Sequence, residues 1–380
     1  MGTIRICVAV TALVHVITYL LNTQLPLHLV ALGGSHAQIG WLFAITTGAA
    51  MLLRPQVGGW TDRYGGRAVM LPGAGILVLT MLALHVAATP LAFIGLMAGL
   101  GVANALLSTT GSIVVADESP VDRRGESLAL YYVASSVGVA LGPAMGFALA
   151  ARGGIALNFT VVTGLGLAVA ALILVLRTAP GNPGAPGGLG PPWSRHAVPA
   201  SAALVVITLG AATVYAFLPL HAAAGGLGHV AWFFPLMSGC TIVCRLLLRR
   251  ASDRFGRVRV LVPALVAITL GQLVLAAPPT VPGLVLGAAL LGCGNSMLYP
   301  TLVALIVDRT PTAERGRAIG TLSAAWDVGL ALGSPLIALL VDTHGFPAGF
   351  LASALAVAAG LALLLLLEHR RRPGPLPASH

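Results

Sequence analysis

The sequence predicts an all-α membrane protein with twelve transmembrane helices, arranged as two related bundles of six. Charged residues make up only 8% of the 380 positions and apolar residues 57%, which is far from the composition of soluble domains. Apolar stretches of roughly 20 residues, the length that crosses a bilayer as a helix, recur along the chain. A shift of 191 residues, the separation of Arg54 and Arg245, aligns the two halves.

Twelve apolar ranges supply the predicted helices, six in each half of the chain. In the first half they lie near residues 5–29, 37–60, 68–88, 90–115, 127–150 and 155–176. In the second half they lie near residues 198–222, 228–250, 258–277, 281–307, 316–341 and 346–367. The first range lacks a small-residue cleavage site, so we expect a retained helix and not a signal peptide. The predicted domains are an N-terminal bundle (1–176), a Pro- and Gly-rich linker (177–197) and a C-terminal bundle with a short tail (198–380).

The arginines are distributed unevenly between the two sides of the predicted spans. Those in the N-terminal segment, the linker, the tail and the loops after the second, fourth, eighth and tenth helices are Arg5, Arg63, Arg67, Arg123, Arg124, Arg177, Arg195, Arg254, Arg257, Arg315, Arg317 and Arg370 to Arg372. Among the loop arginines only Arg152 falls on the other side. Because basic loops stay in the cytoplasm, we expect cytoplasmic termini and a cytoplasmic linker. A composition rich in Ala, Gly and Arg without Lys indicates a bacterial cytoplasmic membrane.

The composition excludes several classes of function. All 21 basic residues are Arg, and without Lys the chain has neither a Walker A loop for ATP nor a Schiff-base site for retinal. The formal charge of +10 fits cytoplasmic loops better than nucleic-acid binding, which needs a soluble basic face. We expect no cofactor, no bound metal, no catalytic residue and hence no enzyme activity. We interpret the four cysteines as small apolar residues that pack in the membrane bundle; they are Cys7, Cys240, Cys244 and Cys293.

The repeat relates unusual residues in the two halves. The shift that carries Arg54 to Arg245 also carries Asp62–Gly65 to Asp253–Gly256, Pro72 to Pro263, Asp117 to Asp308 and Gly142 to Gly333. Both halves therefore share one topology and are related by an axis along the membrane normal. Parallel repeats of this kind are typical of transporters that bind their substrate between the halves.

The loop between the second and third predicted helices, GGWTDRYGGR at residues 58–67, resembles the signature loop of the major facilitator superfamily. A shorter copy lies at residues 253–257. The resemblance covers nearly the whole chain and implies transport by alternating access. It also implies a latch of the outward-facing state, formed by Gly58, Gly59, Asp62, Arg63, Gly65, Arg67, Asp253, Arg254, Gly256 and Arg257. Gly66 and Arg249 depart from the family pattern, so we expect the second latch to be weaker.

Elementary physics supports the latch hypothesis. Gly58 and Gly59 permit a close approach of the second and eleventh helices. Asp62 can accept hydrogen bonds at a helix N-terminus. The alternative is that Arg63 and Arg67 serve only to orient the chain in the membrane.

The fifth predicted helix carries a run of small residues, Gly138, Gly142, Pro143 and Gly146. This run resembles the motif of the proton-antiporting, exporting branch of the superfamily. Small residues at this spacing make a flat face for close packing, and Pro143 bends the helix. Ordinary helix packing is the alternative interpretation. The arginine that many drug antiporters hold in helix 4 is absent, since Gly95 stands there, so proton coupling must use another residue.

Asp327 is the carboxylate that we expect to couple transport to protons. It lies near the middle of the eleventh predicted helix, where a charge is costly unless it faces a cavity. An apolar surrounding favours the protonated form, so the group can take up and release a proton as access alternates. Gly320, Ser323 and Ser334 share its helical face. The alternative is a structural role in hydrogen-bonding two helices.

The first predicted helix carries a polar stripe on one face, made of Thr11, His15, Thr18 and Asn22. His15 is the second candidate for proton coupling, because imidazole titrates near neutrality; a buried structural hydrogen bond is the alternative. Aromatic and amide side chains suit an amphipathic organic ligand. The predicted cavity residues are Thr18, Tyr19, Asn22, Asn104, Tyr131, Ser135, Tyr215, Trp232, Asn295, Tyr299 and Trp326.

His28 and His221 form a repeat-related pair at the predicted outer ends of helices 1 and 7. We interpret them as packing residues near the membrane interface. An external gate is the alternative, and a metal site is disfavoured because the sequence places no carboxylate beside them.

The leading hypothesis is an exporter of a small organic molecule, a drug-like compound or a secreted metabolite, driven by proton antiport. The alternative is a proton-coupled uptake symporter for a sugar or small carboxylate. The helix 5 motif disfavours uptake, and so does the predicted place of Arg54 and Arg245 near the cytoplasmic helix ends, away from the cavity. A membrane sensor is a third hypothesis, for which the chain offers no signalling domain. We expect a monomer in the lipid bilayer, with substrate and protons as its partners.

Overall fold

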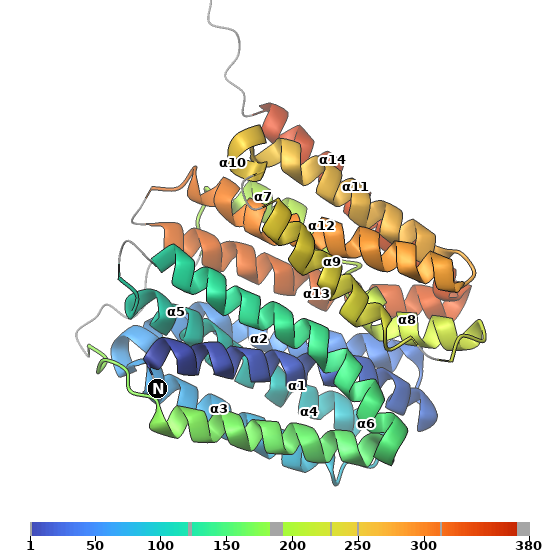
Figure 1. Ribbon diagram of the computed structural model, residues 1–380, viewed down its shortest axis with the longest axis horizontal. Coiled ribbons are helices and arrows are strands. Elements are labelled where there is room, and N and C mark those ends of the chain that lie inside the picture. Colours follow the sequence, from blue (N-terminus) through green and yellow to red (C-terminus); the bar gives the residue numbers. More distant parts are fainter. Residues whose placement is uncertain are drawn as a thin grey trace, which may run out of the picture.

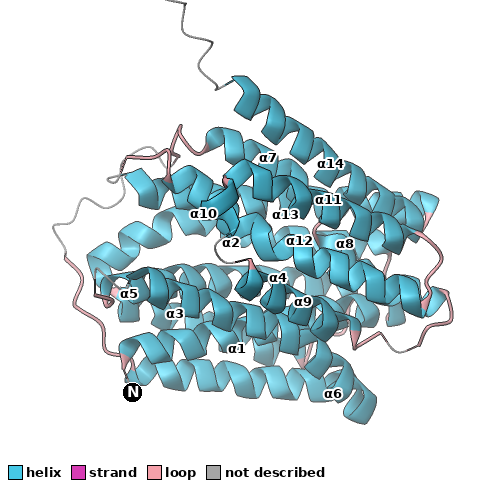
Figure 2. Ribbon diagram, turned by 45° about the horizontal axis from the view of Figure 1, so that its top comes forward, coloured by secondary structure: helices cyan, strands magenta, loops and turns pink. Residues whose placement is uncertain are grey.

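The computed structural model describes residues 2–120, 124–182, 193–228, 230–248, 251–311 and 314–370, and these form helices and loops without a strand (Figure 2). Arg123, Arg249, Arg371 and Arg372, together with residues 183–192 of the predicted linker, lie outside the described residues. Only the backbone is described at Arg124, Asp253, Arg315, Arg317 and Arg370.

The first half of the chain forms six membrane-length helices. Their bounds are α1 (Thr3–Ala31), α2 (His36–Tyr64), α3 (Gly66–Leu84), α4 (Pro90–Asn104) with η1 (Ala105–Thr109) and α5 (Thr110–Asp117), and α6 (Arg124–Val175). The segments α4, η1 and α5 run on as one helix, in which η1 is a π-helical turn. The long α6 is two predicted helices joined end to end. It breaks at Gly153 and Gly154, where the positive φ of Gly154 requires glycine.

The second half repeats this arrangement. Its bounds are α7 (Val198–Thr208), α8 (Ala212–Ala224), α9 (Phe233–Leu247), α10 (Ala251–Phe255), α11 (Arg257–Ala276), α12 (Val281–Val307), α13 (Arg315–His344) and α14 (Phe346–Arg370). The segments α7 and α8 together make one span. Ten described helices qualify as membrane spans by length and hydropathy; one of them, Leu130–Val175, covers two spans, and the shorter apolar helix Phe233–Leu247 completes the twelve predicted.

Each half has an apolar core of its own. Buried side chains of α1 to α6 form one large cluster, and buried side chains of α7 to α14 form another. In Figure 1 the blue-to-green half lies beneath the yellow-to-red half, with the helices of both running in roughly the same direction. The first cluster also takes in Phe217 of α8 and Ile337 of α13, so apolar packing continues across the boundary between the halves.

Glycines bring the backbones of helices into contact at repeat-related places. A Cβ added at Gly138 of α6 would lie 2.5 Å from the His15 Cβ, and one at Gly142 would lie 2.8 Å from the Leu20 nitrogen, both on α1. Gly329 and Gly333 stand 191 residues further on, and a Cβ at either would collide with backbone between Val205 and Leu209. Close packing of α6 on α1, and of α13 on α7, is therefore built into both halves.

The two halves meet along three helix pairs, α2 with α13, α6 with α9, and α1 with α8. We call the end of the bundle that carries the N-terminus the inner end. There Thr3 Oγ1 donates to the Arg177 carbonyl (2.9 Å), and Arg67 Nη2 donates to the Leu174 carbonyl (2.8 Å). The opposite end, where α2 begins at His36 and α13 ends at His344, is the outer end.

Candidate functional site

A cavity of about 570 Å³ lies between the two halves. Its wall comes from α1 and α6 on one side and from α7, α8, α9, α11, α12, α13 and α14 on the other. Six predicted cavity residues line it, namely Tyr19, Ser135, Tyr215, Asn295, Tyr299 and Trp326. The polar or aromatic wall residues that sequence reasoning missed are Tyr132, Ser136, Thr208, Ser238, Thr241, Arg245 and Gln272.

On α6 and α9 the cavity wall lies in the inner half of the bundle, and on α11 it reaches Gln272 toward the outer end. On α6, which starts at the inner end, the wall runs from Leu128 to Val139; on α9, which ends there, it runs from Met237 to Arg245. Toward the outer end the halves are in contact. The Tyr19 and Tyr215 rings meet edge to face with centroids 5.0 Å apart, and the Tyr215 ring stacks on Phe234 at 5.8 Å. The space between the halves is thus closed on the outer side.

Five predicted cavity residues are away from the cavity wall. Asn104 Nδ2 donates to Thr18 Oγ1 (3.3 Å), which joins α4 to α1 inside the first half. The Tyr131 hydroxyl donates to the Ser108 carbonyl (2.8 Å). Asn22 is half-buried on α1, and Trp232 packs against the core of the second half. Thr18, Asn104 and Tyr131 thus join helices within the first half.

His15 also lies in the packing between α1 and α6. Its Nδ1 is 2.8 Å from the Thr11 carbonyl, one turn earlier on the same helix. Its ring stacks loosely on Tyr19, with centroids 6.4 Å apart, and its Cβ faces Gly138. A role of His15 in proton coupling stays a prediction, and the contacts around it are those of a structural histidine.

Asp327 is almost completely buried, with 4% of its surface exposed. Its Oδ2 lies 2.9 Å from Nε of Arg54, without the alignment of a good hydrogen bond. The pair crosses from α13 to α2 and so joins the two halves. Trp326, the neighbour of Asp327 in the chain, lines the cavity. The charged pair therefore lies close to a residue of the cavity wall.

Arg245 corrects one expectation. It was predicted near the cytoplasmic end of its helix and away from the cavity, but its side chain lines the cavity. Nη1 donates to Ser136 Oγ on α6 (3.0 Å), and Nε donates to the Ser296 carbonyl on α12 (3.4 Å). Arg245 reaches the cavity although it lies near the end of α9, because its long side chain carries the guanidinium far from its Cα.

The repeat connects the two arginine contacts. Arg245 is the repeat partner of Arg54, and Asp327 stands 191 residues after Ser136. Each arginine therefore reaches across the boundary between the halves to the same position of the other repeat. Arg54 meets the carboxylate of Asp327 there, and Arg245 meets the hydroxyl of Ser136. The signal that identifies Ser136 in the sequence is the same shift of 191 residues, applied to Asp327.

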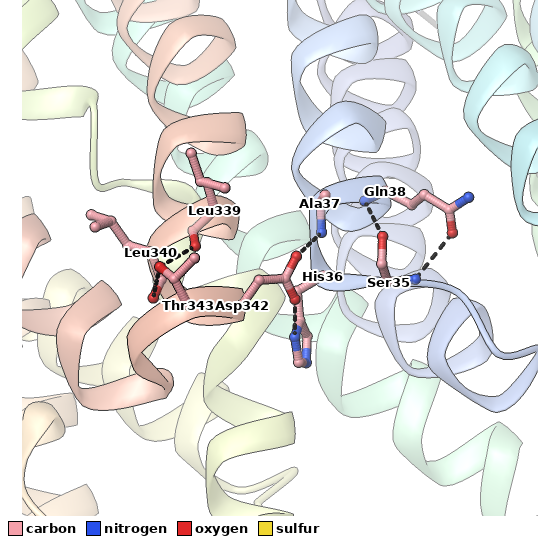
Figure 3. Close-up of polar contacts among 8 residues, drawn as sticks. All are labelled: Ser35, His36, Ala37, Gln38, Leu339, Leu340, Asp342 and Thr343. Atoms are coloured by element: carbon pink, nitrogen blue, oxygen red, sulfur yellow. Dashed lines mark hydrogen bonds and ion pairs between the residues drawn. The ribbon is translucent and has the colours of Figure 1, made fainter.

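A polar contact that sequence reasoning missed closes the outer end (Figure 3). Asp342, near the end of α13, lies with Oδ1 2.7 Å from His36 Nδ1 and accepts a hydrogen bond through Oδ2 from the Ala37 nitrogen (3.0 Å). A carboxylate at the start of α2 satisfies a free N–H and interacts favourably with the helix dipole. Ser35 and Gln38 complete this helix start as a capping box.

The family model of the major facilitator superfamily matches residues 7–238 and 200–380 of this chain. The chain belongs to the major facilitator superfamily. It is therefore a membrane transporter by family, as the signature loop predicted.

Among curated relatives of this transporter, an uncharacterised MFS-type transporter of Pseudomonas aeruginosa is 35% identical over 45% of the chain and 43% of that relative, so the match spans less than half of it. An uncharacterised MFS-type transporter of Salmonella typhimurium is 28% identical over 84% of the chain and 85% of the relative. A staphylopine export protein of Staphylococcus aureus is 23% identical over 95% and 94%.

Solved structures of the same fold include a peptide transporter POT with a TM-score of 0.80 and 15% identity, covering 97% of this chain and 94% of that one. A nucleoside transporter NupG matches with a TM-score of 0.78 and 13% identity, over 98% and 100%. At such low identity these likenesses concern the fold alone.

The superfamily loop after α2 lies at the inner end and contacts the first residues of the linker. The backbone carbonyl of Asp62 accepts from the Asn182 nitrogen (2.9 Å), and the Arg67 nitrogen donates to Thr178 Oγ1 (3.1 Å). Gly65 has a φ of 85°, which favours glycine at this turn. Among the described residues, no atom of another segment lies within 4 Å of a Cβ built at Gly58. The latch with α13, predicted for the outward-facing state, is not engaged here and stays a prediction about that state.

The second copy of the loop has the same turn. Gly256 has a φ of 92°, and the Arg254 guanidinium lies over the Phe255 ring (5.4 Å), as that of Arg63 lies over Tyr64 (5.6 Å). Arg257 binds Asp308 at 3.0 Å. The two loops are thus alike in geometry as well as in sequence.

The histidine pair is separated in the structure. The His28 ring packs against Phe93 and Phe159 in the first half, whereas His221 packs against Phe346 and Phe350 in the second. Among the described residues no group of three or more His, Cys, Asp or Glu is placed to hold a metal ion. The contacts of both histidines are those of packing residues.

Proposed function

We propose that this transporter exports a small organic molecule in exchange for protons. The observation that carries the proposal is the pair of buried Asp327 and half-buried Arg54, which joins the two halves beside the cavity. The inner end is taken as cytoplasmic, with both termini and the linker on that side of a bacterial cytoplasmic membrane. In this arrangement the cavity faces the cytoplasm and can receive its substrate there.

Asp327 couples the proton to the conformational change. A proton on the carboxylate removes its attraction for Arg54 and leaves the guanidinium as an uncompensated charge between α2 and α13. The contact that holds these helices together is then weaker, and the equilibrium between the two facing states shifts. One proton that crosses a potential of roughly 150 mV releases about 3.5 kcal/mol, which sustains a substrate gradient of some hundreds-fold.

Export is favoured by two features. One is the small-residue face of α6, which resembles the motif of exporting antiporters. The other is the similarity over most of the chain to a protein named for staphylopine export. The runner-up is proton-coupled uptake of a small carboxylate, and the place of Arg245 on the cavity wall is the observation in its favour.

Reconstituted liposomes test the proposal. The protein is inserted with a trapped pH-sensitive dye, a proton gradient is imposed, and compounds are screened for proton flux that depends on them. We compare wild type with Asp327→Asn, which keeps the size of the side chain and removes its charge. The matched control is Glu368→Gln, because Glu368 pairs with Arg309 within the second half.

Compound-dependent proton flux opposite to the movement of the compound, lost in Asp327→Asn and retained in Glu368→Gln, is the expected result. Proton and compound moving in the same direction would establish the uptake alternative. Compound movement with equal pH dependence in wild type and Asp327→Asn would remove the coupling role of Asp327.

The domains and the oligomeric state are part of the same proposal. Two six-helix bundles, residues 1–176 and 198–380, move against each other around the cavity, and a single chain contains the whole pathway. Mass measurement of the detergent-solubilised protein tests the monomer.

A further inference from the structure

Arg54 and Arg245 occupy equivalent places in the two halves, but only Arg54 has an acidic partner in the described structure. Arg54 meets Asp327. Arg245 makes its side-chain hydrogen bonds to the Ser136 hydroxyl and the Ser296 carbonyl, which are both neutral. One arginine is therefore neutralised inside the bundle, and its repeat partner keeps its full charge.

The uncompensated charge of Arg245 faces the cavity. Of the described residues on the cavity wall, none is an aspartate or glutamate. The remaining polar groups there are neutral hydroxyls and amides, such as Gln272 and Asn295. A charged group at the edge of an apolar membrane bundle is costly unless an opposite charge or water meets it. The missing negative charge can be supplied from within the cavity.

We propose that Arg245 binds an anionic group of the transported molecule, so that the substrates are organic anions. The inference rests on the proposed transport function and names its substrate class. The guanidinium presents several N–H donors in one plane, a geometry that suits a carboxylate or phosphonate. Nη1 and Nε are already hydrogen-bonded to the protein, which holds the group in place against the wall.

The rest of the wall suits an apolar body attached to that anion. Tyr215, Tyr299 and Trp326 present aromatic surface, and Tyr299 and Trp326 meet edge to face with centroids 6.0 Å apart. Their positions are held from behind, since the Tyr299 hydroxyl lies 2.7 Å from Ser323 Oγ. A volume of about 570 Å³ accommodates a molecule of drug-like size. The cavity thus pairs one fixed cation with an aromatic lining.

Binding to the purified full chain in detergent tests the inference independently of transport. The probes are a panel of aromatic and aliphatic monocarboxylates and phosphonates, each matched to its neutral amide or ester, and the readout is the dissociation constant from calorimetry. In wild type we expect at least one anion to bind about tenfold or more tightly than its neutral partner, as charge-assisted hydrogen bonds do.

Two sets of variants assign that preference to Arg245. Arg245→Gln removes the charge and should abolish the preference, whereas Arg245→Lys should retain part of it. Ser136→Asp places a carboxylate beside Arg245, which reproduces the Arg54 and Asp327 pair, and should also abolish the preference. Ser136→Asn has the same shape without charge and should keep it.

The outcomes separate the inference from the proposed function. A wild type without any anion preference, or a preference that survives either Arg245→Gln or Ser136→Asp, overturns the inference. Transport of neutral compounds in exchange for protons in liposomes, with no anion preference in binding, would support the proposed export function and contradict the inference that the substrates are organic anions. An anion preference in binding without any flux would support the anion site at Arg245 and contradict the proposed transport function.

Discussion

The helices α2 and α13 are packed tightly at the outer end and separated at the inner end. Near the outer end a Cβ added at Gly40 would lie 2.7 Å from the Ala338 Cβ and 2.8 Å from the Ser334 carbonyl oxygen. At Gly58, five turns further along α2, an added Cβ would have no neighbour within 4 Å among the residues that the structure describes. The helix α2 thus carries one glycine, Gly40, that packs closely against α13, and a second glycine, Gly58, that does not.

The difference in packing between Gly40 and Gly58 suggests a hypothesis for how the protein changes between its inward-facing and outward-facing states. On the latch hypothesis, closing the inner end brings α2 and α13 together at Gly58, and opening the outer end separates them at Gly40. Arg54 and Asp327 lie between these points on the same two helices. We expect a change in their charge to act on the contact between these two helices, where a small difference in free energy shifts the equilibrium between the two states.

Gly40→Leu should have the largest effect. The added side chain has no space against Ala338 and Pro335, so the outer end is forced apart at a cost of about 2 kcal/mol to the present state. The ratio of outer-open to inner-open molecules should rise by roughly thirtyfold, with loss of transport. Distances between spin labels at the outer ends of α2 and α13 measure the shift. Unchanged distances would contradict the tight packing described for this state.

Gly58→Leu should shift the equilibrium in the opposite direction. The present state has room for the side chain, whereas the predicted closure of the inner end does not. The same pair of labels should show the outer end closed even when a proton gradient favours opening. Transport should fall by about tenfold or more. If Gly58→Leu and Gly40→Leu shift the distances alike, the latch hypothesis is wrong.

Asp342→Asn should loosen the outer end by a smaller amount. The amide oxygen can still accept from the Ala37 nitrogen, but the charge that faces His36 is lost. Both side chains are 30% exposed, so solvent screens the pair and its contribution is less than about 1 kcal/mol. We expect a rise of about fivefold or less in labelling of cysteines placed behind the outer contact. Asp342→Glu, which keeps the charge, is the control.

Glu368→Gln should have the smallest effect on transport, because its pair with Arg309 (2.6 Å) stays within the second half. The Glu368 hydrogen bond raises the pKa of Arg309. A base with a raised folded-state pKa stabilises the fold below its unfolded pKa, and that stabilisation is lost only as pH rises through the folded value. We therefore expect a drop in thermal stability of about 1 kcal/mol or less, with no contribution from Arg309 to its pH dependence between about pH 5 and 9. An altered distance between the spin labels would contradict this.

Much of the architecture could be predicted because its signals are local or repeated. The length and apolarity of each range predicted the twelve spans, and the shift from Arg54 to Arg245 predicted the repeat. The break of α6 at Gly154 was close to the predicted loop between two helices. The small residues that begin at Gly138 predicted a close helix contact, although not that α1 would be the partner.

The site was harder to predict because it depends on contacts between distant residues. His36 and Asp342 are 306 positions apart, and no pattern in either helix indicates the other. Thr18 and Asn104 were predicted to line the cavity because their side chains are polar. In the structure they form a hydrogen bond with each other between α1 and α4. Helical periodicity identifies a polar face without saying whether a cavity or a neighbouring helix covers it.

The glycine contacts between α1 and α6 have a consequence for the variation that this chain can tolerate. At Gly138 and Gly142 even a methyl group would meet the backbone or Cβ of α1, so these positions admit almost no substitution. The same two helices present Tyr19 and Ser135 to the cavity wall. A lineage that adapts the proposed binding cavity to a new compound can therefore change its wall one side chain at a time, on a framework that selection holds unchanged.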